Sequence, residues 1–351
     1  MEKIGQNLYG LTSPVVDLIA SMFRLHSHEK LEERSAVRDY DGKEELIQWV
    51  QSTRKKLPST LTKELQVFFD FESYIGLSMI RFAMEKKRTG NVSEFIDLLE
   101  KTTPQLLFRC FLNTGFVHGK VNNLDNSEEV FQFISSSNLP DIEKWKLTYL
   151  YMDLELTKKR FITLVRHCYE YYFHEEEEKI KTKQQTSLKQ LTDSLTLNQR
   201  TQLKKIFPHT NKDLVEDEEL TIILSPSIYY GSSSLTSHSE SDFSYLYIYG
   251  ISQPRTLSNG EMDDDQLISS FKIFADEKRI KMIRILTISP NYGYEIAQKL
   301  SLSNSTVSHH LSVLANHDLV TAKRKENRIY YELNKNRIVQ LMETMNQALI
   351  K

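Results

Sequence analysis

The sequence predicts a mainly α-helical protein with small β elements, in which a helical N-terminal domain and a short β segment precede a C-terminal helix-turn-helix module. Three observations predict this class. Apolar residues recur at spacings of three and four from residue 14 to 206, which is the helical period. Between residues 220 and 251, β-branched and aromatic residues replace that pattern. From residue 266 the helical spacing returns, and two alternating strands follow it.

Changes of composition divide the chain into four segments. Residues 1–215 are expected to form a helical sensor or regulatory domain, whose helices are separated by proline-containing breaks. Residues 216–255 are expected to form a β segment packed against it. Residues 256–262 have the composition of a linker. Residues 263–351 are expected to form the C-terminal module.

The β segment is expected to be a small antiparallel sheet. Serine-rich turns that contain Pro226 and Gly231 separate its strand-like runs. These runs cover residues 220–224, 228–230 and 245–249.

Charge is distributed unevenly along a nearly neutral chain. The 351 residues include 45 basic and 47 acidic side chains, but residues 266–351 carry 13 Lys and Arg against 7 Asp and Glu, or +6. The remaining 32 basic and 40 acidic residues leave −8 on the rest of the chain. A basic module on an acidic body suits a protein that contacts a polyanion with one end, because Lys and Arg release phosphate counterions.

The sequence predicts a cytoplasmic protein with reduced thiols. No run of 18 apolar residues occurs, and Ser13, Pro14 and Asp17 interrupt the N-terminal apolar stretch, so neither a membrane span nor a secretory signal is expected. Cys110 and Cys168 are the two cysteines, which excludes a disulfide framework and a four-thiolate zinc site.

A helix expected at residues 304–317 has the features of a DNA-reading helix. Val307, Leu311 and Leu314 form one buried stripe, and the opposite face is small, polar and free of carboxylates. Such a face fits the major groove of double-stranded DNA, and the helix N-terminus supplies free amides for phosphate. The predicted DNA contacts are Ser303, Asn304, Ser305, Thr306, Ser308, His309 and Ser312. An exposed helix of a small helical domain is the alternative interpretation.

A basic β-hairpin is expected directly after this helix, at residues 319–333. Val320, Ala322, Ile329, Tyr331 and Leu333 alternate with polar residues and are expected to face inward. The tip concentrates four positive charges, which suit contact with phosphate or the minor groove. These are Lys323, Arg324, Lys325 and Arg328. By itself such a run could be a solvated turn, but after the polar helix it predicts the wing of a winged helix-turn-helix.

The combined pattern resembles the ArsR-type winged-helix regulators of bacteria. The resemblance rests on Phe271–Leu286, on Glu295–Leu314 with its run STVSHHLSVL, and on Leu319–Val320 and Arg328–Leu333. It implies the order helix-helix-helix-helix-strand-strand-helix, a homodimer, and recognition by the helix at 304–317. It also implies a dimer interface that uses the first and last helices of the module. The candidate interface residues are Leu267, Phe271, Ile338, Leu341, Met342, Met345 and Leu349.

The metal sites known from such regulators are missing from this sequence. Their thiolate site needs cysteines in the third helix, but residues 293–300 contain none. Their other site uses His and carboxylates on the last helix, but residues 335–351 contain no His and one acid, Glu343. No metal and no cofactor are therefore expected. His309, His310 and His317 are expected to serve DNA contact or packing.

Residues 1–255 are expected to sense a small-molecule effector or a partner and to change the geometry of paired DNA-binding modules. Repression by occupying a promoter is the preferred mode, with activation left open. An enzyme fused to a DNA-binding module is the main alternative, although no Walker loop, dinucleotide glycine pattern, Gly-x-Ser-x-Gly elbow or His-Glu-x-x-His motif occurs. A protein-interaction module whose winged helix does not bind DNA is a third possibility.

The closest approach to a catalytic or metal cluster lies on a tyrosine-rich segment. His167 and Cys168 precede His174 and Glu178, which are four apart and share a helix face. A metal would need further ligands, so a structural role is favoured. The aromatic residues around position 170 could line a ligand pocket, but core packing is the preferred interpretation.

Overall fold

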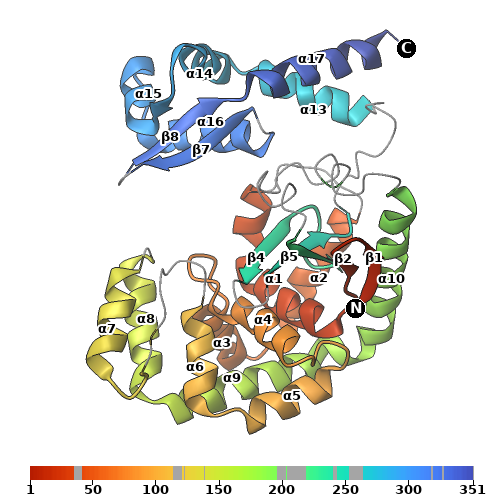
Figure 1. The fold of residues 1–351 in the computed structure, drawn as a ribbon, viewed down its shortest axis with the longest axis vertical. Helices are drawn as coiled ribbons and strands as arrows, with labels where there is room; N and C mark the ends of the chain where they lie inside the picture. The colour runs from red at the N-terminus through yellow and green to blue at the C-terminus, as the bar shows by residue number, and fades with distance from the viewer. Residues whose placement is uncertain are drawn as a thin grey trace. The chain divides into compact units, whose positions relative to one another are not determined.

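The computed structural model describes residues 1–34, 42–113, 121, 123–137, 139–195, 203, 219–239, 243–252, 264–317, 319–325 and 328–350. These residues form two compact units. The N-terminal unit comprises the described parts of Met1–Glu33, Val37–Asp193 and Glu218–Gln253, and the C-terminal unit comprises the described parts of Arg34–Ala36, Ser194–Asp217 and Pro254–Lys351. Figure 1 shows the elements of both units. The class is mainly helical with small sheets, as the sequence predicts.

The N-terminal unit is built largely from helices. A 3-10 turn at Ile75–Leu77 and a π-helical turn at Tyr169–Phe173, followed by a 3-10 turn at His174–Glu176, interrupt them. The α-helices are α1 (Pro14–Arg34), α2 (Lys43–Lys56), α3 (Ser59–Phe68), α4 (Ser78–Glu85), α5 (Val92–Lys101), α6 (Pro104–Leu112), α7 (Ser127–Ser136), α8 (Asp141–Met152), α9 (Leu154–Cys168) and α10 (Glu177–Ser194).

Local side-chain chemistry explains where several of these helices start. The side chains of Asn91, Thr103 and Asp153 each accept a hydrogen bond from a backbone amide three residues on, at the starts of α5, α6 and α9. Such caps satisfy amides that have no partner inside the helix. Pro104 occupies the first position of α6, where a missing amide hydrogen costs nothing.

The described strands of the N-terminal unit form a mixed sheet, which corrects the expected antiparallel one. Its strands are β1 (Glu2–Gly5), β2 (Leu8–Gly10), β3 (Thr221–Ser227), β4 (Ser234–Ser239) and β5 (Ser244–Gly250), in the order β1-β2-β3-β5-β4. The strands β2, β3 and β5 run parallel, whereas β1 and β4 pair antiparallel with β2 and β5. After β3 the chain forms β4 at the edge of the sheet and then returns as β5, which lies between β3 and β4. Because β5 is antiparallel to β4, it runs in the same direction as β3.

The expected strand at Ile228–Tyr230 is wrong, because the chain turns there. The amide of Gly231 donates to the carbonyl of Ile228 at 3.2 Å, and the amide of Ser233 donates to the carbonyl of Tyr230 at 2.7 Å. Gly231 has a φ of 57°, which favours glycine. A Cβ on Gly250 would lie 1.8 Å from the Gly231 carbonyl oxygen, so the two backbones meet too closely for a side chain.

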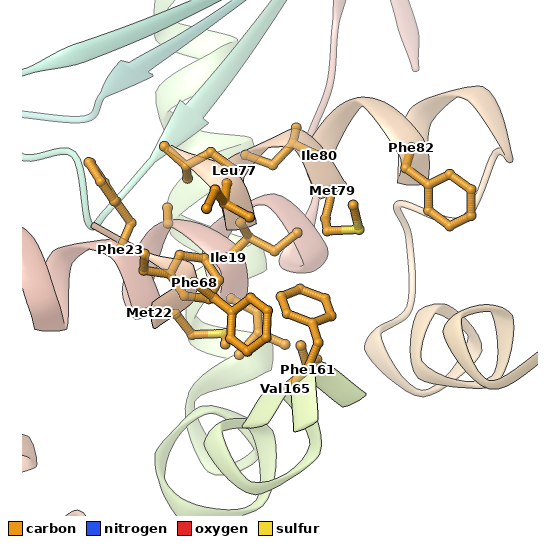
Figure 2. Close-up of a cluster of buried hydrophobic side chains, with 14 of the residues drawn as sticks. Ile19, Met22, Phe23, Phe68, Leu77, Met79, Ile80, Phe82, Phe161 and Val165 are labelled. Carbon is orange, nitrogen blue, oxygen red and sulfur yellow. The ribbon is translucent and has the colours of Figure 1, made fainter. Parts of the chain in front are cut away.

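One hydrophobic core joins these helices to the sheet. Ile19, Phe23, Phe68 and Phe161 lie in it with the sheet residue Ile248, all of them buried. Figure 2 shows part of this cluster, with Phe68 and Phe161 beside each other; their ring centroids are 5.2 Å apart in an edge-to-face arrangement. Edge-to-face contacts add to the burial of apolar area that holds the unit together.

A buried polar network crosses this core at the start of α1. The carboxylate of Asp17 accepts hydrogen bonds from the Ser227 hydroxyl and, at 2.9 Å, from Nε2 of Gln184. Oε1 of Gln184 accepts from the Ser13 amide at 2.8 Å. Burial raises the pKa of Asp17 to about 7, although these hydrogen bonds lower it. The network ties α1 to α10 and β3.

Arg24 forms a second buried polar contact of α1. Its side chain is almost completely shielded from solvent. Its Nε donates to the carbonyl of Tyr229 at 2.7 Å, and its Nη1 lies 2.8 Å from Oε1 of Glu32. A buried charge with a carboxylate partner fixes α1 against the turn that follows β3.

The C-terminal unit has its own small core and the element order of a winged helix-turn-helix. Val307, Leu311, Leu314 and Met282 are among its fully buried residues. Its elements are α13 (Asp264–Phe274), α14 (Glu277–Ile288), β6 (Asn291–Tyr292), α15 (Gly293–Leu300), α16 (Asn304–Asn316), β7 (Val320–Lys325), β8 (Arg328–Leu333) and α17 (Lys335–Leu349). The strands form an antiparallel sheet in the order β6-β8-β7.

Candidate nucleic-acid interface

The turn between α15 and α16 is closed by backbone geometry. Ser301 ends α15 in the left-handed conformation, with a φ of 53°. The amide of Leu302 then donates to the carbonyl of Ala297 at 3.0 Å. This reversal ends α15 within one turn and directs the chain into α16. Leu300 and Leu302 pack against the core of the unit, as the sequence suggested.

Ser303 begins α16 as its cap. Its Oγ accepts a hydrogen bond from the Thr306 amide at 3.2 Å, and its hydroxyl lies 2.7 Å from the Thr306 hydroxyl. The two predicted DNA contacts Ser303 and Thr306 therefore lie together at the exposed start of the helix. The other amides of this first turn point along the helix axis, where the helix dipole favours an anion such as phosphate.

The buried stripe of α16 is where the sequence predicts it. Val307, Leu311 and Leu314 are fully buried in the core of the unit. By helical periodicity, Ser305 and Ser312 then lie on the opposite face of the backbone.

The side chains of several predicted DNA contacts lie outside the described part of the chain. In α16 these are Asn304, Ser305, Ser308, His309 and Ser312.

His310 lies on the inner side of α16. It is buried, and its Nδ1 lies 3.7 Å from a carboxylate oxygen of Asp276, the residue that caps α14. Burial opposes ionisation of Asp276, but the Arg279 amide and the charges of Arg279 and His310 outweigh it and lower the pKa of this carboxyl. Of the two alternatives for this histidine, packing fits its position.

The hairpin β7–β8 brings the four predicted basic residues to its end. Lys325 pairs with Arg328, Arg324 with Ile329, and Lys323 with Tyr330. The four basic positions therefore occupy the last three pairs before the tip. The structure describes only the backbone of these four basic residues.

At the base of the hairpin, the predicted inward positions are described in part. Val320 is buried, whereas Tyr331 and Leu333 are half-buried. The side chains of Ala322 and Ile329 lie outside the described residues.

A third strand was not expected from the sequence. β6 pairs Asn291 with Tyr331 and Tyr292 with Tyr330 of the hairpin. The rings of Tyr292 and Tyr330 lie 5.9 Å apart. With two residues, β6 is too short to produce an alternating pattern, so no sequence signal could reveal it.

The predicted dimer residues divide into a buried and an accessible group. Leu267, Leu341 and Met345 are buried in the core of their own unit, and Ile338 is half-buried. Phe271 on α13 and Met342 and Leu349 on α17 are exposed.

Two further apolar residues are exposed on the same two helices, Ile268 on α13 and Val339 on α17. α13 and α17 pack against each other. They therefore present an apolar surface to solvent in a single chain.

The polar cluster of the tyrosine-rich segment is engaged by its neighbours. Burial raises the pKa of the Cys168 thiol to about 12, so it is a poor nucleophile and metal ligand. Nδ1 of His174 lies 2.9 Å from the Tyr169 hydroxyl. Glu178 receives a hydrogen bond from Lys181 at 2.8 Å. Across the described residues, no three His, Cys, Asp or Glu side chains gather as metal ligands would.

Aromatic residues near position 170 contribute to packing. Tyr172 contacts the Trp49 ring edge-to-face at 5.7 Å, and the rings of Trp49 and Tyr229 lie 4.5 Å apart. The Tyr172 hydroxyl lies 3.0 Å from that of Ser21.

None of the helices within the described ranges is long and apolar enough to span a membrane.

Comparison with known proteins adds to this geometry. The family model described as bacterial regulatory protein, arsR family, matches residues 276–322. The arsenical resistance operon repressor of Staphylococcus aureus is 25% identical over 85 residues, which cover 24% of this chain and 82% of that protein. The transcriptional repressor SdpR of Bacillus subtilis (strain 168) is 33% identical over 64 residues, covering 18% and 71%. The transcriptional activator HlyU of Vibrio cholerae is 23% identical over 94 residues, covering 27% and 87%.

Proposed function

The chain belongs to the arsR family of bacterial regulatory proteins through its C-terminal unit, and on this premise we propose that it represses transcription by binding an operator as a homodimer. It is a DNA-binding transcription regulator. The observation that carries the proposal is the pairing of α16, capped by Ser303 and free of carboxylates, with a hairpin whose last three residue pairs hold four basic residues. Repression is favoured because it needs only occupancy of a promoter.

The two elements have different roles in this proposal. The polar face of α16 enters the major groove and contacts base edges or backbone there. The proposed readers are Ser305, Thr306, Ser308, His309 and Ser312. The hairpin holds the phosphate backbone or the adjacent minor groove through Arg324 and its basic neighbours. Phosphate contacts set affinity and its salt dependence, whereas base contacts set sequence preference.

Dimerisation is proposed through α13 and α17. The exposed apolar residues Phe271, Met342 and Leu349 support this assignment, because a partner surface would remove them from water. The buried residues Leu267, Leu341 and Met345 would pack beneath that face, in the core of the unit. A two-fold dimer presents two copies of α16, which suits an operator with two half-sites.

The N-terminal unit is proposed to carry the regulatory signal. A small molecule or partner that binds this unit changes operator affinity if it favours one arrangement of the paired DNA-binding units over another. A thermal-shift screen of metabolites against the full chain finds such a ligand as a stabilising shift. A ligand that shifts stability and leaves operator affinity unchanged would contradict this role.

The proposal is tested by fluorescence-anisotropy titration of the full chain against the DNA upstream of its own gene and against a scrambled duplex, at several salt concentrations. Tight, salt-sensitive binding to the first duplex is expected. Arg324→Ala should weaken binding to both duplexes and reduce the salt slope by about one. Arg284→Ala, which removes an exposed arginine of α14, is the matched control and should change neither quantity. Equal binding to both duplexes by the unmodified chain would overturn sequence-specific regulation.

A further inference from the structure

Two polar side chains close the corner between α13 and α14. Only Ala275 and Asp276 separate the end of α13 from the start of α14. Oδ1 of Asp276 accepts the Arg279 amide at 2.9 Å and so caps α14. The guanidinium of Arg279 returns to the last turn of α13, where Nε donates to the carbonyl of Ile273 at 2.9 Å and Nη2 to that of Lys272 at 2.6 Å. These contacts hold the two helix ends together.

His310 joins α16 to this corner. From the inner side of α16, its Nδ1 lies 3.7 Å from Oδ1 of Asp276, the same oxygen that caps α14. The side chain of His310 is 10% exposed and that of Asp276 30% exposed. Polar groups that are shielded from water in this way interact more strongly than groups on the surface. One carboxylate oxygen therefore serves both α14 and α16.

This contact differs in kind from the apolar packing of α16. Val307, Leu311 and Leu314 bury one face of the helix, and α16 packs against α14 and α15 (Figure 1). Apolar burial is non-directional, so it tolerates small rotations of the helix about its axis better than a directional contact does. A contact between a ring nitrogen and a carboxylate has a direction, and a shielded polar contact can select one arrangement of a core.

Small rotations of α16 matter for the recognition of bases. A helix with its side chains has a radius of about 5–6 Å, so a rotation of about 10° moves the end of a side chain by roughly 1 Å. Hydrogen bonds to base edges tolerate less than this, because donor and acceptor must lie within about 2.7–3.2 Å of each other. A residue that limits the rotation of α16 therefore controls how well the helix matches the bases, although it faces the core.

The corner also connects α16 with a helix of the proposed dimer interface. Arg279 binds the carboxyl end of α13, and α13 carries the exposed residues Ile268 and Phe271. In a two-fold dimer, the separation and orientation of the two copies of α16 depend on how each copy is placed relative to its own dimer helix. The contacts from His310 through Asp276 to Arg279 run between these two helices.

We infer that His310 is a positioning residue for operator binding: through Asp276 and Arg279 it fixes the orientation of α16 relative to α13, and thereby sets which spacing of two DNA half-sites the dimer accepts. The inference rests on the proposed DNA-binding function and extends it to a residue on the inner side of α16. His310 acts through the helix to which it belongs and not through a base.

Asp276→Asn separates this role from the role of Asp276 as a cap. Asparagine caps a helix as well as aspartate does, so α14 keeps its start, whereas the carboxylate that faces His310 is lost. Asp153→Asn is the matched control, because the side chain of Asp153 caps α9 of the N-terminal unit by accepting the Leu156 amide at 2.8 Å. Thermal unfolding verifies that both variants are folded.

Hydrogen exchange of the free chain tests the contact without DNA. In Asp276→Asn the backbone amides of α16 should exchange about threefold faster or more, because the helix loses a polar attachment, whereas those of α15 should not change. Asp153→Asn should change neither helix. Unchanged exchange of α16 in Asp276→Asn would overturn the inference, whether or not the chain binds DNA.

Fluorescence-anisotropy titration tests the positioning. One probe is the DNA upstream of the chain's own gene, and the other carries one extra base pair at the centre of the site that the chain protects from nuclease. The insertion separates the half-sites by about 3.4 Å and rotates them by about 35°. Asp276→Asn should bind the first duplex about fivefold more weakly and the second nearly as well as the unmodified chain does. Equal losses on both duplexes would indicate a destabilised unit and would overturn the inference.

A double-mutant cycle assigns the effect to His310. His310→Gln alone should reproduce the reduced preference for the native spacing, and adding Asp276→Asn should then cost no further affinity. Additive losses would show that the two residues act independently, which contradicts the inference. Failure of the unmodified chain to bind either duplex would instead overturn the proposed function, and hydrogen exchange would still decide whether His310 attaches α16 to the corner.

Discussion

The two units of the chain differ in how their stability and their function are distributed. The N-terminal unit surrounds a large aromatic core and holds buried polar groups, among them Arg24 and Asp17. The C-terminal unit has a small aliphatic core, and its predicted DNA contacts belong to α16, to the cap before it and to the hairpin β7–β8. A larger core buries enough apolar area to offset the free-energy cost of desolvating charges, whereas a small core provides little free energy for this. The function of the C-terminal unit could therefore be inferred more readily from the sequence than that of the N-terminal unit.

The largest effect is expected from Arg24, which sharpens this contrast. Arg24→Ala removes the donor to the Tyr229 carbonyl and leaves Glu32 with the more distant ammonium of Lys43, at 4.0 Å. Breaking one side of such a buried pair should lower the unfolding free energy by about 3–5 kcal/mol. Urea unfolding followed by circular dichroism measures the loss. Arg88→Ala, which removes an exposed ion pair with Glu94, should cost about 0.5 kcal/mol or less. Similar losses for the two variants would show that the buried network is not stabilising.

Matched core substitutions test whether the two units unfold separately. Leu164 and Leu311 are both fully buried, one in each core. Each Leu→Ala substitution should cost about 3 kcal/mol, because it removes apolar contacts and leaves a cavity. Calorimetry should assign the two losses to different transitions, and Leu311→Ala alone should abolish DNA binding. A single transition that moves equally in both variants would show that the units unfold together.

The C-terminal fold could be predicted because local rules act on it at close range. The stripe Val307, Leu311 and Leu314 defines α16, and alternation defines the hairpin that follows. The DNA contacts predicted on these elements remain predictions, since the structure describes few of their side chains. Neither the apolar stripe of α16 nor the alternation in the hairpin depends on distant parts of the chain.

The sheet of the N-terminal unit depends on partners far away in sequence. β2 pairs with β3 across more than 200 residues, for example Leu8 with Ile222, and no local pattern encodes that pairing. The parallel pairing of β3 with β5 follows from the position of β4 at the edge of the sheet, and tertiary structure also determines that position. The sequence therefore predicts β3 and β5, but not β1, β2 or β4, nor the order and direction of the strands.

Asp17 is expected to make the unfolding free energy of the N-terminal unit depend on pH. Burial raises its pKa from 3.8 to about 7, so the folded state binds the proton more tightly than the unfolded state. The stabilisation is complete below about pH 4 and is lost progressively as the pH rises to about 7, a fall of roughly 4 kcal/mol. Asp17→Asn cannot ionise and should not show this fall. Urea unfolding at several pH values measures the difference, and parallel curves for the two proteins would contradict the assignment.

The smallest effect compares one helix cap in each unit. Ser303 caps α16 and Asn91 caps α5, and each side chain accepts a hydrogen bond from an amide three residues on, at 3.2 Å and 3.0 Å. Replacing either residue by Ala should cost about 1 kcal/mol, because one amide loses its partner. The proposed function separates them, since Ser303 also lies among the predicted DNA contacts. Ser303→Ala should weaken operator binding in anisotropy titration at temperatures where the unit remains folded, whereas Asn91→Ala should leave affinity unchanged. Equal operator affinities for the two variants would restrict Ser303 to its structural role as a cap.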